Sequence, residues 1–390
     1  MSRWTDELFD GLSHEGDPDA DAVIAAHVAT APPAHPRGLV SSLAHHLVLP
    51  PAQRSAPIQA YLSQQPPLPV WTDAAKLHQS GDFFDQHALT IGTALFCASL
   101  PHAYAGARGA RVLTLTSRMV TDPVRRIYET AQMLFDAMSL GGLAPATGAG
   151  YQDIRRVRLM HAAVRFLVLN DPDVPKTTVP APWPAWCTTT GTPINQEDLL
   201  GTLMTFTTVV FESLDRLGVV YSDEEADSYL HAWCVAGHLL GIRPDLLPLT
   251  LDDAHEITAT IRRRQTHPSE DAERLGGALV CAMRKSMRWR LLRSLPAAMV
   301  RWNVGPEVAK INGVSTYNPL SMVFNGAAWF IRRIGLEARH NKMLRVVSRH
   351  VGAAVLGSFV NAGRTGSRPP FELPQRLDQQ VHDARSRWSL

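Results

Sequence analysis

Cysteine is scarce in this chain, and its spacing excludes the common cysteine-based sites. Among 390 residues there are only 4 cysteines, Cys97, Cys187, Cys234 and Cys281. No two of them have C-x-x-C spacing, so neither a zinc site nor an iron–sulfur cluster is indicated. Each lies among apolar or aromatic neighbours and is expected to be a small buried hydrophobe, which is typical of a reducing compartment.

Three further absences limit the location and the partners of the protein. No apolar run approaches the ~18–20 residues that are needed to cross a bilayer. The acidic stretch 1–21 lacks the basic start, apolar run and cleavage site of a signal peptide. The 38 lysines and arginines are scattered and the net charge is only +2, so nucleic acid is not an expected partner. These features predict a cytoplasmic protein without a transmembrane segment.

Sustained strand alternation is missing as well, whereas apolar residues recur with helical spacing along most of the chain. The best-defined helix is expected at 196–218, with Asn195 as its N-cap, and the next begins at a Ser222-x-x-Glu225 capping box. A Pro-rich loop is expected at 170–195. Helices are predicted at 20–30, 39–49, 83–99, 108–119, 122–139, 152–169, 196–218, 223–241, 252–264, 270–295, 298–309, 319–335 and 339–360. One all-helical domain over 1–390 is predicted, with a loose C-terminal arm at 361–390.

One predicted helix places a histidine in its apolar stripe. The stripe of YQDIRRVRLMHAAVRFLVL, at 151–169, contains Ile154, Val157, His161, Val164 and Val168. An imidazole in that position is either a core histidine that bonds to a neighbour or an axial ligand for a buried cofactor. The residue type and its spacing allow both interpretations.

A second helix places three polar side chains on one face. Arg126, Glu129 and Thr130 stand at i, i+3 and i+4 in the run RIYET. A guanidinium, a carboxylate and a hydroxyl in this arrangement can bind a polar ligand. They can also simply form an Arg–Glu pair on the surface.

Several runs together resemble the latex clearing protein (rubber oxygenase) family and its wider MpaB-type relatives. The resemblance extends from Gly16 to about Pro248, and its specificity lies in the order and spacing of the pieces. These are GDPDAD at 16–21, ALFCASLPHAYAGARGARVL at 94–113, RRIYETAQ at 125–132, VRLMHAAVR at 157–165, GTPINQEDLLGT at 191–202 and HAWCVAGHLLGI at 231–242.

The resemblance implies an all-α, globin-like helical core with additional helices around a buried pocket for one b-type haem. His161 would occupy the family's proximal ligand position, as an imidazole fixed by packing and aimed into an apolar cavity. Arg126 and Thr130 would match the distal-side Arg and Thr of the family motif. The implied reaction joins dioxygen with a hydrophobic substrate.

The chain departs from the rubber-cleaving members at two points. Where some of them carry a distal lysine, this chain has Glu129, so the distal side is expected to be open or water-ligated. Those enzymes also use a glutamate upstream of the motif as a candidate base, but between Ala103 and Tyr128 the only acid here is Asp122. Glu129 is therefore either a replacement proton acceptor or a partner that holds Arg126.

Two more histidines are candidates for the same pocket. His231, Cys234 and His238 share a helical face at i, i+3 and i+7, a spacing that a transition metal could use. We expect instead that His231, His238 or both line or support the haem pocket.

The sequence thus favours a haem oxygenase that acts on an apolar, unsaturated small molecule by cleaving a C=C bond or oxidising a C–H bond. A terpenoid, fatty or secondary-metabolite intermediate fits a cytoplasmic enzyme better than solid rubber. Three alternatives remain open. They are a haem enzyme that uses peroxide or runs a dehydration, a haem-binding sensor or carrier, and a helical scaffold without cofactor.

Overall fold

A computed structural model describes residues 3–30, 32, 39, 43, 47, 49–115, 123–170, 191–286, 293–315 and 320–338. At 123–129, 286, 334, 335, 337 and 338 it describes the backbone only. The helix predicted at 339–360, the arm predicted at 361–390 and most of the loop predicted at 170–195 lie outside the described residues.

Every regular element in the described part of the chain is helical, and the single β feature there is an isolated bridge between Gly106 and Thr266. The all-α fold class predicted from the sequence is confirmed. The α-helices are α1 (Asp6–Leu12), α2 (Pro18–Thr30), α4 (Ala56–Ser63), α5 (Ala74–Ala94), α6 (Leu100–Ala105), α7 (Ala107–Leu115), α9 (Pro123–Met138), α10 (Ala149–Asn170), α11 (Gln196–Phe206), α12 (Thr208–Arg216), α13 (Asp223–Leu239), α14 (Leu251–Gln265), α15 (Glu270–Ser286), α16 (Leu295–Ile311) and α17 (Ser321–Ala338). A π-helix, Leu95–Ser99, joins α5 to α6, and 3₁₀ turns lie at Pro51–Gln53 and Pro244–Leu246.

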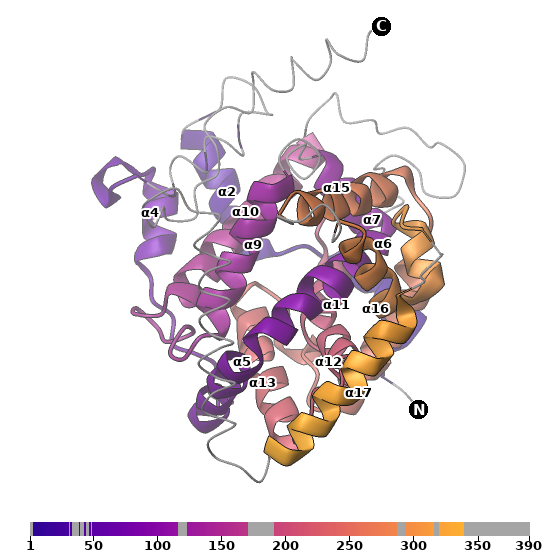
Figure 1. The fold of residues 1–390 in the computed structure, drawn as a ribbon. Helices are drawn as coiled ribbons and strands as arrows, with labels where there is room; N and C mark the ends of the chain where they lie inside the picture. The colour runs from indigo at the N-terminus through magenta and orange to yellow at the C-terminus, as the bar shows by residue number, and fades with distance from the viewer. Residues whose placement is uncertain are drawn as a thin grey trace, which may run out of the picture.

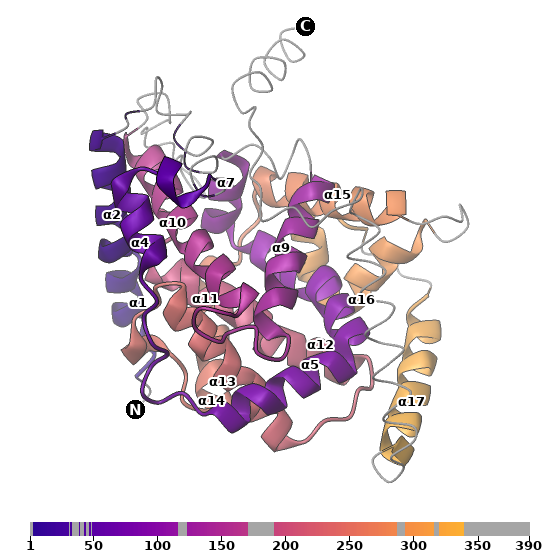
Figure 2. The same cartoon turned by 90° about the vertical axis from the view of Figure 1, so that its left-hand side faces the viewer.

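The largest core lies where α5, α12 and α13 meet (Figures 1 and 2). Its centre is aromatic, because Phe83 of α5, Phe211 of α12 and Tyr229 of α13 contact one another edge to face or at a tilt, with ring centroids 5.5–6.3 Å apart. Such packing buries a large apolar area and fixes ring orientation. α5 and α13 therefore form a closely packed pair, and α12 packs on α5.

The helix predicted as continuous over 196–218 is instead broken at Thr207, which has φ −115° and ψ −85°. The hydroxyls of Thr207 and Thr208 donate to the carbonyl oxygens of Leu203 and Met204, and Thr208 also hydrogen-bonds Thr258 of α14 at 2.7 Å. Side-chain hydroxyls that bond to carbonyls one turn back disturb a helix, and β-branched residues add crowding. The prediction was wrong because apolar residues continue with helical spacing on both sides of these threonines.

The two helix starts predicted from side-chain chemistry are confirmed. Asn195 accepts from the backbone N–H of Asp198, and Ser222 forms the expected capping box with Glu225. Other bounds differ, since α5 begins at Ala74 rather than at 83, and the short helices α1, α4 and α6 were not predicted. Helices of six to eight residues have too few turns for a clear apolar period.

α10 is the element that positions the site. It packs against α2 and α9, and it also contacts α13. Ile154, Val164 and Val168 of its predicted stripe are buried, whereas Val157 and His161 are half-buried.

Candidate functional site

α9 and α10 form an antiparallel helical hairpin whose closed end is tight. The backbone N–H of Tyr151 donates to the carbonyl of Gly142 at 2.9 Å. A Cβ added to Gly150 would lie 2.2 Å from the Cα of Ala137, so only glycine allows this approach. The register of the two helices is thereby fixed where they join.

That register brings two of the predicted site residues to one level. His161 lies twelve residues after Ala149, the first residue of α10, and Arg126 lies twelve residues before Met138, the last of α9. At ~1.5 Å per residue, both positions are about 18 Å from the closed end of the hairpin. Thr130 is one turn nearer the closed end and is half-buried.

The structure describes the backbone of the residues predicted to form the distal face. Arg126, Glu129 and Thr130 all belong to α9, so the shared helical face expected from their spacing exists. The side chains of Arg126 and Glu129 lie outside what the structure describes. Their distal role therefore stays a prediction.

Two arginines, one before and one after His161 in the sequence, fix the orientation of α10 about its own axis. Arg158 donates to both oxygens of Asp17 through Nε and Nη2, at 2.6 and 2.7 Å. Arg165 donates through Nε to Asp21 at 2.9 Å and through Nη1 to the carbonyl of Ile194 at 2.8 Å. Arg165 is 2% exposed whereas Asp21 is 38% exposed, so a buried guanidinium pairs with a carboxylate that reaches the surface.

Through these contacts the acidic run at 16–21 orients α10, the helix that carries His161. Asp17 and Asp21 flank the start of α2, and a Cβ on Gly16 would approach the Arg165 side chain to 3.2 Å. Although burial opposes it, bonding to Asp17 raises the pKa of Arg158. The sequence prediction missed this role, because the acids and the arginines that pair lie more than 140 residues apart.

We expect Asp17→Ala to lower the free energy of unfolding by about 3 kcal/mol, because it strands the nearly buried guanidinium of Arg158. Asp19→Ala is a matched control, since Asp19 is 89% exposed and its Oδ2 is 3.5 Å from Nη2 of Arg158. The control should change stability by less than about 0.5 kcal/mol. Urea unfolding followed by circular dichroism measures both, and equal losses in the two variants would remove the positioning role from Asp17.

His231 and His238 meet around an aromatic side chain that the sequence analysis did not select. The Trp71 ring contacts both imidazoles edge-on, with centroids 5.7 and 6.2 Å away. Nε2 of His231 accepts from the backbone N–H of Asp73, the N-cap of α5, at 2.9 Å. Burial lowers the pKa of both histidines, which favours neutral rings. Their expected role in a haem pocket is not tested by these contacts.

The same helix does not provide a metal site. Sγ of Cys234 is buried and donates to the carbonyl of Pro248 at 3.5 Å. Within the described residues, no group of three or more His, Cys, Asp or Glu side chains could hold a metal ion. The alternative of a transition metal bound by His231, Cys234 and His238 is therefore not supported.

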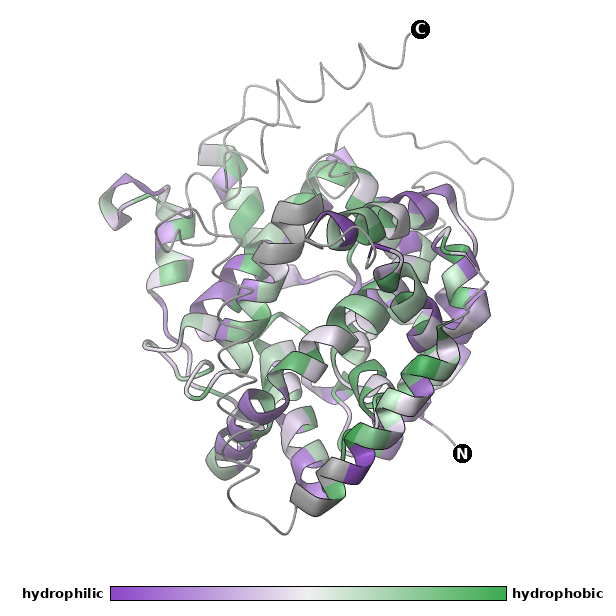
Figure 3. Cartoon of the chain, in the orientation of Figure 1, coloured by the Kyte–Doolittle hydropathy of each residue, from purple (hydrophilic) through white to green (hydrophobic). Residues whose placement is uncertain are grey.

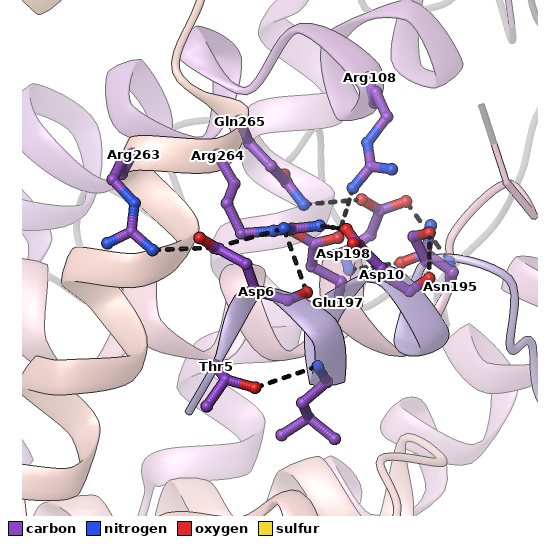
Figure 4. Close-up of polar contacts among 12 residues, drawn as sticks. Thr5, Asp6, Asp10, Arg108, Asn195, Glu197, Asp198, Arg263, Arg264 and Gln265 are labelled. Atoms are coloured by element: carbon purple, nitrogen blue, oxygen red, sulfur yellow. Dashed lines mark hydrogen bonds and ion pairs between the residues drawn. The ribbon is translucent and has the colours of Figure 1, made fainter. Parts of the chain in front are cut away.

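A buried carboxylate links α7 to three other helices through ion pairs. Glu197 of α11 is fully buried and accepts from Nη2 of Arg108 at 2.6 Å and from Nε of Arg264 at 2.9 Å (Figure 4). Arg264 also pairs with Asp10 of α1 at 2.8 Å. Glu197 therefore joins α7, α11 and α14, and through Arg264 it also joins α1.

A small cavity with a mainly apolar wall lies beside this network and is separate from the hairpin. Its wall includes His102, Asp198, Arg262 and Gln265, and none of its lining residues belongs to α9 or α10. Burial raises the pKa of Asp198 to about 6, and burial together with Arg262 and Arg216 lowers the pKa of His102 to about 3. This cavity is not the predicted cofactor site.

The fold agrees with the comparisons to known proteins. Residues 83–333 match the family described as ER-bound oxygenase mpaB/B′/rubber oxygenase, catalytic domain. The chain is 25% identical over 316 residues to the rubber oxygenase of Streptomyces sp. (strain K30), covering 80% of this chain and 74% of that protein. A structure of latex clearing protein in the closed state superposes with a TM-score of 0.70 at 23% identity, covering 92% of this chain and 93% of that one.

The family match spans more than half of the chain and includes α9 and α10 entirely. The protein belongs to the mpaB/rubber oxygenase catalytic-domain family, and it is an oxygenase. The resemblance noted from the sequence is confirmed.

Proposed function

We propose that the protein is a haem b oxygenase that acts on an apolar, unsaturated small molecule. The observation that supports this proposal is the helical hairpin, in which Arg126 of α9 and His161 of α10 are both twelve residues from the closed end. A haem oxygenase needs a ligating imidazole and a hydrogen-bond donor near the bound oxygen, and His161 and Arg126 would supply these two groups. Family membership implies haem, and the residues of this chain supply the detail.

The residues present fit that cofactor. His161 is a half-buried imidazole on a long helix, with buried Met160 and Val164 beside it in the chain. Its neighbours Arg158 and Arg165 are held by Asp17 and Asp21, so α10 cannot rotate freely. In this proposal His161 holds the iron, and the bound haem supplies the activation of dioxygen.

The polar residues of α9 would stabilise charge and handle protons during the reaction. Arg126 and Thr130 would hydrogen-bond to negative charge that develops on the reacting oxygen. Glu129 would either accept a proton from the substrate or orient Arg126. The apolar surroundings would bind the substrate and exclude bulk water.

The proposal is tested first by the ultraviolet–visible spectrum of the purified protein, oxidised and reduced, together with a pyridine haemochrome measurement. A haem b spectrum is expected, and a protein that neither retains nor takes up haem would end the proposal.

The reaction is tested with squalene and its saturated counterpart squalane in an oxygen electrode, with mass spectrometry of the products. We expect oxygen consumption and carbonyl products with squalene only, because cleavage of C=C by one O₂ yields two C=O groups. Turnover of both compounds would indicate C–H oxidation. Turnover with peroxide but without O₂, or stable O₂ binding without turnover of any alkene, would replace the proposal by the peroxide or sensor alternative.

A further inference from the structure

The outer surface of α17 is the most apolar exposed helix face in the described part of the chain. Six of the twelve exposed large apolar side chains there belong to this one helix. Trp329 and Phe330 are 69% and 59% exposed, and Met322 is 83% exposed. Figure 3 shows the hydrophobic colouring of this helix at the edge of the body, and Figure 2 shows that it stands apart from α9 and α10.

α17 is attached to the body by its opposite side. Nε1 of Trp302 donates to Oδ1 of Asn325 at 2.9 Å, and the ring of Trp302 packs against Phe324. The carbonyl of Ala328 comes so close to Gly218 that a Cβ there would lie 2.0 Å away. These contacts occupy the inner face of α17, so its apolar outer face is directed away from the body.

The apolar face is wide. At about 100° per residue, the side chains of Met322, Val323, Trp329, Phe330 and Leu336 cover an arc of about 140°. A seam that pairs with one partner helix is narrower than this, whereas a helix lying on a continuous apolar medium uses a broad face. Monomeric soluble proteins rarely leave so large a patch uncovered.

The charge on this helix distinguishes between possible partners. Arg332 and Arg333 are both exposed, and α17 contains a single acid, Glu337, so the helix carries one excess positive charge. By helical position, Arg333 projects from the middle of the apolar arc. A second copy of α17 would bring four arginines together with only two acids, the Glu337 of each helix, and burying this excess of like charge is costly. On a bilayer, its long side chain reaches the lipid phosphates while its methylene groups stay in the apolar layer.

We propose that α17 is an interfacial helix that docks the protein on anionic phospholipid surfaces, with its Trp and Phe at the headgroup level and its two arginines on phosphate. None of the described helices is long and apolar enough to span a bilayer, so the expected contact is peripheral. The proposal does not depend on haem or on the reaction.

Co-sedimentation of the full-length protein with vesicles tests the proposal. We expect binding to equal mixtures of phosphatidylcholine and phosphatidylglycerol, and much weaker binding to phosphatidylcholine alone or at high salt. Replacing both Trp329 and Phe330 by serine should weaken binding more than about tenfold. Replacing Arg332 and Arg333 by glutamine should weaken it about fivefold per arginine.

Val70→Ser and Leu249→Ser are the matched controls, because both side chains are exposed but lie off α17. They should leave vesicle binding unchanged, and circular dichroism should show that every variant stays folded. Binding that survives the Trp329 and Phe330 replacement, or no binding by the wild type, overturns the proposal. A concentration-dependent dimer that those same replacements dissociate would assign the face to a second copy instead.

Discussion

His161→Ala is expected to abolish stable haem binding while leaving the fold intact. Loss of groups that merely support a metal ligand commonly costs 10- to 100-fold in metal affinity, so loss of the ligand itself should cost more than about 100-fold. The helix should persist, because His161 is half-buried and the packing of α10 rests on Leu159, Ala162 and Ala163, which are fully buried. Haem content by pyridine haemochrome and helicity by circular dichroism measure the two effects separately.

His161→Gly with added imidazole sharpens this test. If His161 supplies only an imidazole to the iron, the small molecule should enter the vacated space and restore haem content and the Soret band. His231→Ala and His238→Ala serve as comparisons, since Trp71 contacts both rings and the Asp73 backbone donates to His231. Full haem occupancy in His161→Ala with loss in either comparison variant would move the ligand to α13.

The helical fold followed from the sequence where local chemistry decides the outcome. The Asn195 and Ser222 caps and the apolar period of 152–169 are local features, and the structure contains the corresponding helices. The break at Thr207 was missed because the period continues through it. Its cause includes a contact with Thr258 of α14, which is distant in sequence.

Candidate site residues could be selected from the sequence, but the contacts that support them could not. His161 and Arg126 stood out by pattern and by family resemblance, and their common level follows from two helix lengths and one turn. The pairs Arg158–Asp17 and Arg165–Asp21 join positions more than 140 residues apart. Only the packing of α2 on α10 decides that these charges meet, so a pattern read along the chain could not pair them.

Arg126→Ala is expected to lower turnover by ~10²–10³ while haem content stays near that of the wild type. A guanidinium level with His161 would stabilise negative charge that develops on the reacting oxygen, and alanine removes that stabilisation without touching the proximal ligand. Arg126→Lys should recover only part of the rate, because an ammonium keeps the charge but loses the planar donor fork. Steady-state oxygen consumption and haem content are measured on the same preparations.

Glu129→Gln then separates the two roles that the sequence allows for this carboxylate. If Glu129 accepts a proton from the substrate, turnover should collapse and the acidic limb of the pH profile of kcat/KM should disappear, while dioxygen binding to the reduced protein survives. If Glu129 only orients Arg126, turnover and dioxygen binding should weaken modestly and together, and the pH profile should keep its shape. Near-normal turnover in both Arg126→Ala and Glu129→Gln would show that this face of α9 is not the distal side, and the assignment of the site would then have to begin again from His161 alone.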